Sequence, residues 1–405
     1  MTGAVITGLG VIAPTGIGAA AYWAATRAGH LGIRAIDRFD ATGWPAVLAG
    51  EVGGFDPADH LPGRLIAQTD RMTQFALAAT DWAVTEAGLG PTDLAGAAIS
   101  TAAAFGGFEY GQQQLQSLWR QGPKYVSTYM SFAWFYAVNA GQISIRNAMR
   151  GPASVFVGEQ AGGLDAIGNA LRQVRSGAAV VITGGMESSR SPYGHASHLG
   201  NRDISREPRP ERAYLPFSPD ACGYVPGEGG AILVVEPDTA AQRRQTVPYG
   251  RISGHGAAFD ARPDAPGSGL RRAAELALTD AQLSPGDIDA VFADAGGTRA
   301  LDRAEATAIA GLFGRQAVPV AAPKAGVGRL CSGGGPLDVV AALLAFHDAM
   351  LPPAGGVTAP DPVYGIDLVT SEPRPWAGRN ALILARGAGG FHSALVLTAP
   401  DPVRD

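Results

Sequence analysis

The chain has 405 residues, and its 31 basic and 36 acidic side chains leave a formal net charge of −5. Hydrophobic residues make up 46% of it, which supplies ample material for a core and excludes disorder for the bulk of the chain. The acidic balance, without clusters of Lys or Arg, argues against nucleic acid as a main partner.

Cysteine and apolar patterning narrow the class further. Two cysteines, Cys222 and Cys331, are too few for a disulfide framework and restrict any cysteine chemistry to two positions. No stretch reaches about 18 apolar residues without Gly, Pro or a charge, so we expect no membrane-spanning helix. Residues 1–6 are apolar but lack a basic region, which favours a buried strand over a signal peptide. We therefore expect a soluble, cytoplasmic protein.

In chain order, short apolar runs alternate with longer helical patterns, which is typical of an α/β protein with buried strands. The strands expected in the first half are 4–8, 97–102, 153–157, 178–182 and 231–235. We expect a helix after the third of them, through Leu171, and a turn at 183–185 after the fourth.

A polar segment with prolines near both ends, 236–248, is expected to join two halves of the chain. The second half repeats the alternation, with strands and helices expected in the order 290–293 (strand), 302–313 (helix), 318–321 (strand), 337–350 (helix), 380–385 (strand) and 393–397 (strand). The pattern predicts a duplicated fold with halves 1–240 and 241–405.

The strand at 153–157 leads through a tight turn into a run of small residues that opens a helix. This arrangement places Gln160 at a helix N-terminus, where free N–H groups favour developing negative charge and where enzymes place nucleophiles. Gln160 is neutral and not a nucleophile, so the local pattern alone favours an ordinary strand–helix connection.

Several motifs together resemble the condensing enzymes, the ketosynthases of the thiolase fold. They are the opening run 5–14, the glycine-rich loop 226–231 that follows Phe217, Asp220 and Gly223, the pair Lys324 and Gly328, and the glycines of 387–390. Segments 158–165 and 131–139 are similar, more narrowly, to the chain-length factor, the β subunit of type II aromatic polyketide ketosynthases. The resemblance implies thiolase-like, duplicated αβαβα layers with mixed five-stranded sheets.

The catalytic positions of that family are changed in this chain. A condensing enzyme needs a thiolate to carry the acyl chain and two histidines to stabilise the thioester oxyanion. Gln160 fills the cysteine position, and Gly296 and Arg329 fill the two histidine positions. We therefore expect no condensation by this chain alone. We expect Cys331 to be a packed, inert thiol, and Cys222 to be structural.

The resemblance suggests that Gln160 assists decarboxylation of a malonyl thioester by donating a hydrogen bond to its oxygen as the enolate forms. The alternative is that Gln160 only fills the former cysteine pocket. The sequence favours neither.

The resemblance also implies a pocket at a heterodimer interface whose depth limits the polyketide length. Phe108, Gly111 and Leu115 have the spacing of one helical face and correspond to the gating positions of chain-length factors. Gly111 and Leu115 are smaller than the Thr and Phe of factors that stop at short products, so we expect a longer chain. An ordinary core stripe is the alternative. Whether the aromatic segment 132–136 belongs to the interface or to the core stays open.

We thus expect a non-condensing subunit whose partners are a cysteine-bearing ketosynthase α subunit, an acyl carrier protein and a malonyl or polyketide thioester. We expect no metal and no cofactor of its own, because the substrate is carried on the phosphopantetheine of the carrier protein. The alternatives are an independent malonyl-thioester decarboxylase, an atypical ketoacyl synthase, or a binding scaffold without chemistry.

Overall fold

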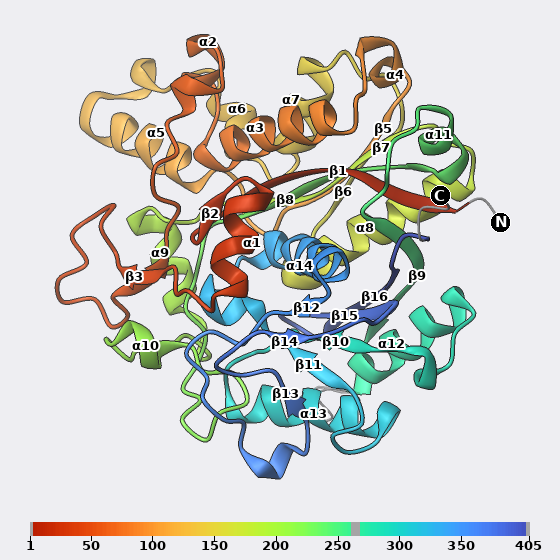
Figure 1. Ribbon diagram of the computed structural model, residues 1–405. Coiled ribbons are helices and arrows are strands. Elements are labelled where there is room, and N and C mark those ends of the chain that lie inside the picture. Colours follow the sequence, from red (N-terminus) through yellow and green to blue (C-terminus); the bar gives the residue numbers. More distant parts are fainter. Residues whose placement is uncertain (1–2, 261–267, 402–405) are drawn as a thin grey trace.

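Two five-stranded sheets with the same strand order form the centre of the molecule. The computed structural model describes residues 3–260 and 268–401 (Figure 1). In the first half the strands, in spatial order, are β1 (Ala4–Ala13), β8 (Gly229–Pro237), β7 (Val181–Glu187), β5 (Ala98–Ala102) and β6 (Ala153–Phe156). In the second half they are β9 (Gly250–Phe259), β16 (Phe391–Thr398), β15 (Asn380–Gly387), β10 (Ala290–Phe292) and β11 (Pro319–Ala321).

Counted along the chain within each half, both sheets have the order first, fifth, fourth, second, third. The pairings match as well, since the first two are antiparallel and the last two are parallel in each sheet. The duplicated α/β fold expected from the sequence is therefore confirmed. The division between 1–240 and 241–405 stays a prediction.

The two sheets join through β1 and β9, which pair over three residues of each strand. Two short strands extend the joined sheet: β2 (Gly16–Ile17) pairs with β1, and β13 (Asp367–Leu368) pairs with β11. Two small sheets lie outside it. They consist of β3 (Ile33–Ala35) with β4 (Leu48–Gly50), and β12 (Met350–Leu351) with β14 (Arg374–Pro375).

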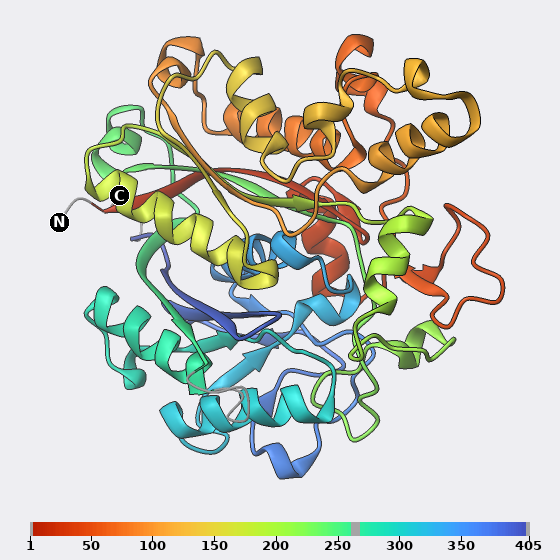
Figure 2. The same ribbon diagram turned by 180° about the vertical axis from the view of Figure 1, so that it is seen from behind.

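Helices form three layers around the two sheets (Figures 1 and 2). Helices α3 (Arg71–Glu86) and α7 (Val138–Arg146) cover the outer face of the first sheet, and α12 (Ser268–Ala281) and α13 (Arg299–Phe313) lie outside the second. Between the sheets lie α8 (Glu159–Arg175) from the first half and α14 (Gly334–Asp348) from the second. Each central helix packs against strands of both halves.

The remaining helices are peripheral or connect these layers. The α-helices among them are α1 (Ala19–Arg27), α2 (Gly63–Ile66), α4 (Pro91–Ala95), α5 (Phe108–Gln121), α6 (Met130–Ala133), α9 (Pro192–Leu199), α10 (Pro210–Ala213) and α11 (Asp238–Arg243). The 3-10 helices are η1 (Pro57–Asp59), η2 (Pro123–Tyr125), η3 (Pro285–Asp287), η4 (Pro323–Gly326), η5 (Cys331–Gly333) and η6 (Pro362–Tyr364).

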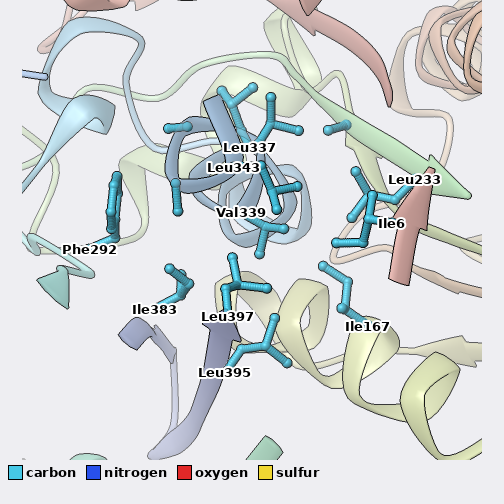
Figure 3. Packing of buried hydrophobic residues seen from close by; sticks show 14 of the residues in the cluster. Ile6, Ile167, Leu233, Phe292, Leu337, Val339, Leu343, Ile383, Leu395 and Leu397 are labelled. Carbon is cyan, nitrogen blue, oxygen red and sulfur yellow. The ribbon is translucent and has the colours of Figure 1, made fainter. Parts of the chain in front are cut away.

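The core is continuous through the central layer. Figure 3 shows α14 surrounded by apolar side chains of both halves, with Ile6 and Leu233 on one side and Ile383 and Leu397 on the other. A helix buried on all sides is expected to be mostly apolar around its circumference, and α14 is, with the buried Asp338 as a charged exception. In the described part of the chain, every helix is too short or too polar to span a membrane.

Most expected elements lie within a few residues of the observed ones, but two expectations were wrong in detail. The turn expected at 183–185 lies inside β7, where Gly184 has φ +132° and a Cβ would lie 2.1 Å from the carbonyl oxygen of Ala231 on β8. These glycines serve close strand packing and not a turn. The helix expected at 337–350 begins at Gly334 and ends at Asp348. The polar segment 236–248 contains the end of β8 and α11 and leads to β9, the first strand of the second sheet along the chain.

Candidate functional site

The site begins at the connection between β6 and α8. Glu159 is the first residue of α8 and has φ +49°, a conformation that non-glycine residues rarely adopt. This turn directs the next side chain, Gln160, into the space between the two halves, where it is fully buried. The strained turn is the kind that holds a nucleophile in an active enzyme.

The amide of Gln160 is bound by a residue of the other half. Its Nε2 donates a hydrogen bond of 2.8 Å to Oδ1 of Asp294, which follows β10. Its Oε1 accepts no hydrogen bond from any described residue and packs against the start of α14, where a Cβ on Gly334 would lie 2.9 Å away. Gln160 is thus held inside the protein by Asp294 and the backbone of α14.

Arg329, at the second histidine position, is clamped by carboxylates. Its guanidinium donates two hydrogen bonds to Glu159, at 2.8 and 2.9 Å, and one of 2.6 Å to the carbonyl oxygen of Arg386. Its Nη1 also lies 3.5 Å from Oδ2 of Asp294. Although burial favours the neutral form, the carboxylates of Glu159 and Asp294 hold the pKa of Arg329 well above its ordinary value. Arg329 is a fixed, paired cation.

The space beside Gly296, at the first histidine position, is occupied by a second arginine. A Cβ on Gly296 would lie 3.0 Å from Nη2 of Arg386 and 2.8 Å from Cβ of Leu301. Arg386 forms ion pairs with Asp294 (3.2 Å) and Glu305 (3.3 Å) and donates to the carbonyl oxygen of Leu301 at 2.8 Å. Side chains larger than glycine would displace this arginine.

Asp294 is the centre of this network, because it contacts Gln160, Arg329 and Arg386. Burial alone would raise the pKa of Asp294, but Arg329, Arg386 and Lys324 hold it well below its ordinary value. Lys324 itself donates to Asp338 and to the carbonyl oxygen of Ala293. A neutral amide (Gln160), a glycine (Gly296) and a paired cation (Arg329) thus stand around one buried carboxylate.

A pocket of about 570 Å³ opens above this network. Its walls include Glu159, Asp294, Arg329 and Arg386, and its rim is formed by the glycine-rich loop 387–390. Gln160 does not line the pocket. His392 lines it too, with Nε2 at 3.0 Å from Asp260, but neither the sequence nor the structure explains why a histidine stands there.

Neither cysteine is placed to replace the missing thiolate. Cys331 is buried, and burial together with the carboxylates of Glu159 and Glu187 raises its pKa well above the ordinary value. A thiol is reactive only as the thiolate, so Cys331 is held in its unreactive form. Cys222 is exposed and lies at the edge of a separate surface pocket.

The three expected gating residues lie on α5, at the periphery of the first half. Gly111 is buried, and a Cβ there would lie 3.5 Å from Cβ of Trp134 and 3.8 Å from Cε of Met130. Phe108 is half-buried and contacts the rings of Phe105 and Tyr193. Leu115 is half-buried. Their role in gating stays a prediction.

The aromatic segment that the sequence left open lies mainly at the surface. Trp134, Phe135 and Tyr136 are 47%, 45% and 44% exposed, so they are not core residues. On the same half, β6 is the end strand of its sheet and leaves one edge without a partner strand among the described residues. Exposed aromatic rings and an open strand edge are both typical of protein interfaces.

Sequence reasoning missed two parts of this site. The sequence does mark Arg386 as unusual, since it is the only charge inside the apolar run 380–387. It does not show which carboxylates this arginine would pair with. Asp294 precedes the first histidine position by two residues, yet nothing in its local sequence indicates that it would bind Gln160 of the other half.

Comparison with known proteins identifies the family to which the chain is similar. Two family models match the chain: the N-terminal domain of beta-ketoacyl synthases over residues 2–241, and the C-terminal domain over 249–358. The tetracenomycin polyketide synthase ketoacyl synthase beta subunit of Streptomyces glaucescens is 54% identical, over 97% of both chains.

Among solved structures, the ishigamide ketosynthase/chain length factor matches with a TM-score of 0.91 and 28% identity, covering 98% of this chain and 99% of that one. A second match is AntDE:AntF, a type II polyketide synthase acyl-carrier protein in complex with its ketosynthase. Its TM-score is 0.89 at 25% identity, over 99% of this chain and all of that one.

Proposed function

The chain belongs to the beta-ketoacyl synthase family, among its ketosynthase beta subunits (chain-length factors), and we propose that it is the non-condensing subunit of a heterodimeric type II polyketide ketosynthase. In this role it shapes the tunnel in which the polyketide grows, while a cysteine-bearing α subunit forms the carbon–carbon bonds.

One observation carries the non-condensing role: none of the three catalytic positions holds a group suited to condensation, and a buried charge network surrounds them. Condensation requires a thiolate and groups that stabilise an oxyanion. Gln160 supplies no thiolate, Gly296 has no side chain, and Arg329 is held by Glu159. Changing one position back would therefore leave the other two unable to act.

The proposal includes a partner that covers the surface around Trp134, Phe135 and Tyr136 and the free edge of β6. This surface supports a heterodimer because large aromatic side chains gain stabilisation when a partner removes their exposed area from water. The partner is proposed to carry the reactive cysteine and to receive malonyl units from an acyl carrier protein. The solved AntDE:AntF complex, in which a carrier protein is bound to a ketosynthase, supports this arrangement by similarity.

For Gln160 the geometry supports a structural role over assistance in decarboxylation. Its side chain is fully buried, does not line the pocket, and uses one amide N–H for Asp294. A malonyl thioester in the pocket would meet Glu159 and Arg329 first. If Gln160→Ala in the complete complex slows malonyl decarboxylation, the structural role is wrong. Unchanged priming supports it.

Co-expression tests the subunit role. The chain produced alone is expected to be insoluble or unstable. Produced with a similar ketosynthase that carries cysteine at the position of Gln160, it is expected to purify as a stable one-to-one complex. A soluble, catalytically active homodimer would contradict the proposal and favour an independent decarboxylase or an atypical ketoacyl synthase.

The gating role has its own test. Gly111→Thr with Leu115→Phe is expected to shorten the main polyketide made by the complex, because both substitutions fill space along α5. Mass spectrometry of the products measures the change in chain length, and an unchanged length would show that these residues are not the gate.

We propose no metal and no resident cofactor. The cytoplasmic location expected from the sequence stays a prediction.

A further inference from the structure

Helix α5 has few apolar contacts that fix its position. Only Tyr110 and Gly111 of its fourteen residues are buried, and its outer face carries several polar side chains. A helix of this kind depends on its ends for its position, because most helical stability in proteins comes from packing of an apolar face. The end that matters here is the first turn, which contains Phe108 and Gly111.

One carboxylate joins this turn to the rigid part of the molecule. Oδ1 of Asp70 accepts the backbone N–H of Met72 at 2.9 Å and so caps α3, while Oδ2 accepts the backbone N–H of Tyr110 at 2.9 Å. Asp70 is 2% exposed. Since α3 packs on β1 and β8, the position of α5 is tied through Asp70 to the central sheet.

The opposite side of the same turn is closed by backbone carbonyls of the aromatic segment. The N–H of Gly107 donates to the carbonyl oxygen of Trp134 at 3.1 Å. A Cβ on Gly107 would lie 2.1 Å from the carbonyl oxygen of Ala133 and 2.6 Å from Cβ of Asp70. Glycine is therefore required here for close approach from both sides. An ion pair between Glu109 and Arg38 (2.7 Å) is a third attachment of this turn.

We propose that Asp70 is a positioning residue for product length, which holds the first turn of α5 against the Trp134 carbonyl and so fixes where Phe108 and Gly111 stand. This inference rests on the proposed gating function of α5. It also links the gate to the partner, because Trp134 is both a carbonyl acceptor for the turn and part of the exposed aromatic surface.

The test compares Asp70→Asn with the matched control Asp361→Asn in the complete heterodimer. Asparagine has the same shape but a single acceptor oxygen, so it satisfies the N–H of Met72 or of Tyr110 but not both. Asp361 caps η6 in the other half through the N–H of Val363, at 3.0 Å, and is remote in sequence from α5. The readouts are the distribution of product lengths, the total rate of chain assembly and the hydrogen exchange of the Tyr110 amide.

We expect Asp70→Asn to raise the share of products of other lengths about threefold, as befits one lost buried hydrogen bond, and to speed exchange at Tyr110. Total chain assembly and the control variant should stay unchanged. An unchanged length distribution would overturn the proposal, and so would a lower rate without a change in length, which indicates a merely structural cap.

Two further variants separate the possible failures. If Asp70→Asn does not assemble with the partner, Glu109→Gln, which weakens the ion pair to Arg38 at the same turn, is judged by the same readouts. If Gly111→Thr with Leu115→Phe leaves product length unchanged, the gating function itself is wrong. In that case the role of Asp70 in holding α5 is tested only by the rate of hydrogen exchange of the Tyr110 amide.

Discussion

At the scale of single residues, the environment of Gln160 decides what this position can do. It lies at the N-terminus of α8, which favours a thiolate, but it is buried beside the carboxylates of Glu159 and Asp294, which oppose one. The positive charge of Arg329 does not stabilise a thiolate at this position, because Glu159 already neutralises that charge. The sequence predicted the loss of the nucleophile but not this surrounding network, since its members come from distant parts of the chain.

Restoring the cysteine should therefore not restore the enzyme. In Gln160→Cys, we expect the new thiol to react with iodoacetamide at neutral pH about tenfold or more slowly than a free thiol, because burial and neighbouring carboxylates raise its pKa. Peptide mapping by mass spectrometry measures the labelling, with the exposed Cys222 of the same chain as the internal reference. Rapid labelling at position 160, or condensation with a partner that lacks its cysteine, would contradict this expectation.

Glu187, at the end of β7, gives a second residue-scale prediction. Burial raises its pKa from 4.5 to about 8, although backbone N–H groups of Ala104 and Phe105 partly oppose the shift. Between these two values the folded protein binds more protons than the unfolded chain, so stability falls as pH rises through this window. Glu187→Gln, a neutral side chain of the same size, should make the decline between about pH 5 and pH 8 shallower.

Denaturant unfolding of the complex at several pH values measures this slope. Part of the decline should remain in the variant, because burial also raises the pKa values of Glu51, Asp70 and Asp302 to about 7. An identical slope in the variant and the parent protein would show that Glu187 is ionised in the folded state.

At the scale of helices and strands, close approaches between backbones fix the position of α5 and the spacing of β7 and β8. At the start of α5 the carbonyl oxygens of Ala133 and Trp134 lie where the Cβ atoms of residues 107 and 106 would stand. The apolar runs of buried strands predicted most of the sheet correctly. The glycines of β7 were mistaken for a turn, because a glycine that admits a neighbouring strand looks the same in sequence as one that turns the chain.

Gly107→Ala tests whether the close backbone approach at the start of α5 is needed for stability. We expect it to destabilise the protein by about 1–3 kcal/mol, the usual cost of forcing extra atoms into a packed site, and to disturb product length. Gly96→Ala is the matched control, because a Cβ at the end of α4 meets nothing within 4 Å and the backbone has an ordinary negative φ. Thermal unfolding compares the two, and equal melting temperatures would show that the first turn of α5 shifts without cost.

At the scale of the whole molecule, the two halves share their central layer and so cannot be independent. Helix α8 of the first half packs on β15 and β16 of the second, and α14 of the second half packs on β7 and β8 of the first. The alternation of strands and helices made the duplication predictable from the sequence. The sharing of these helices was not predictable, since periodicity shows how much of a helix is apolar but not which sheet each face will meet.

Residues 1–240 produced alone should therefore be insoluble or molten, because the face of α8 that meets the second sheet would be open to water. In the complete protein, Leu164→Ala on α8 should lower the melting temperature seen by probes in both halves equally, with a loss of about 2–5 kcal/mol. Leu164 is fully buried in the shared core. Two separate transitions would show that the halves unfold independently.

The duplication is not symmetrical at its outer edges, and this limits how the molecule can assemble. The third strand of the first half, β6, ends its sheet, whereas the corresponding strand of the second half, β11, is followed by the two-residue strand β13. Very short edge strands resist the addition of another strand. In the joined sheet of the described residues, strand addition is therefore favoured at β6 and disfavoured at β13, so a pairing at β6 would close after one partner and would not propagate through the sheet.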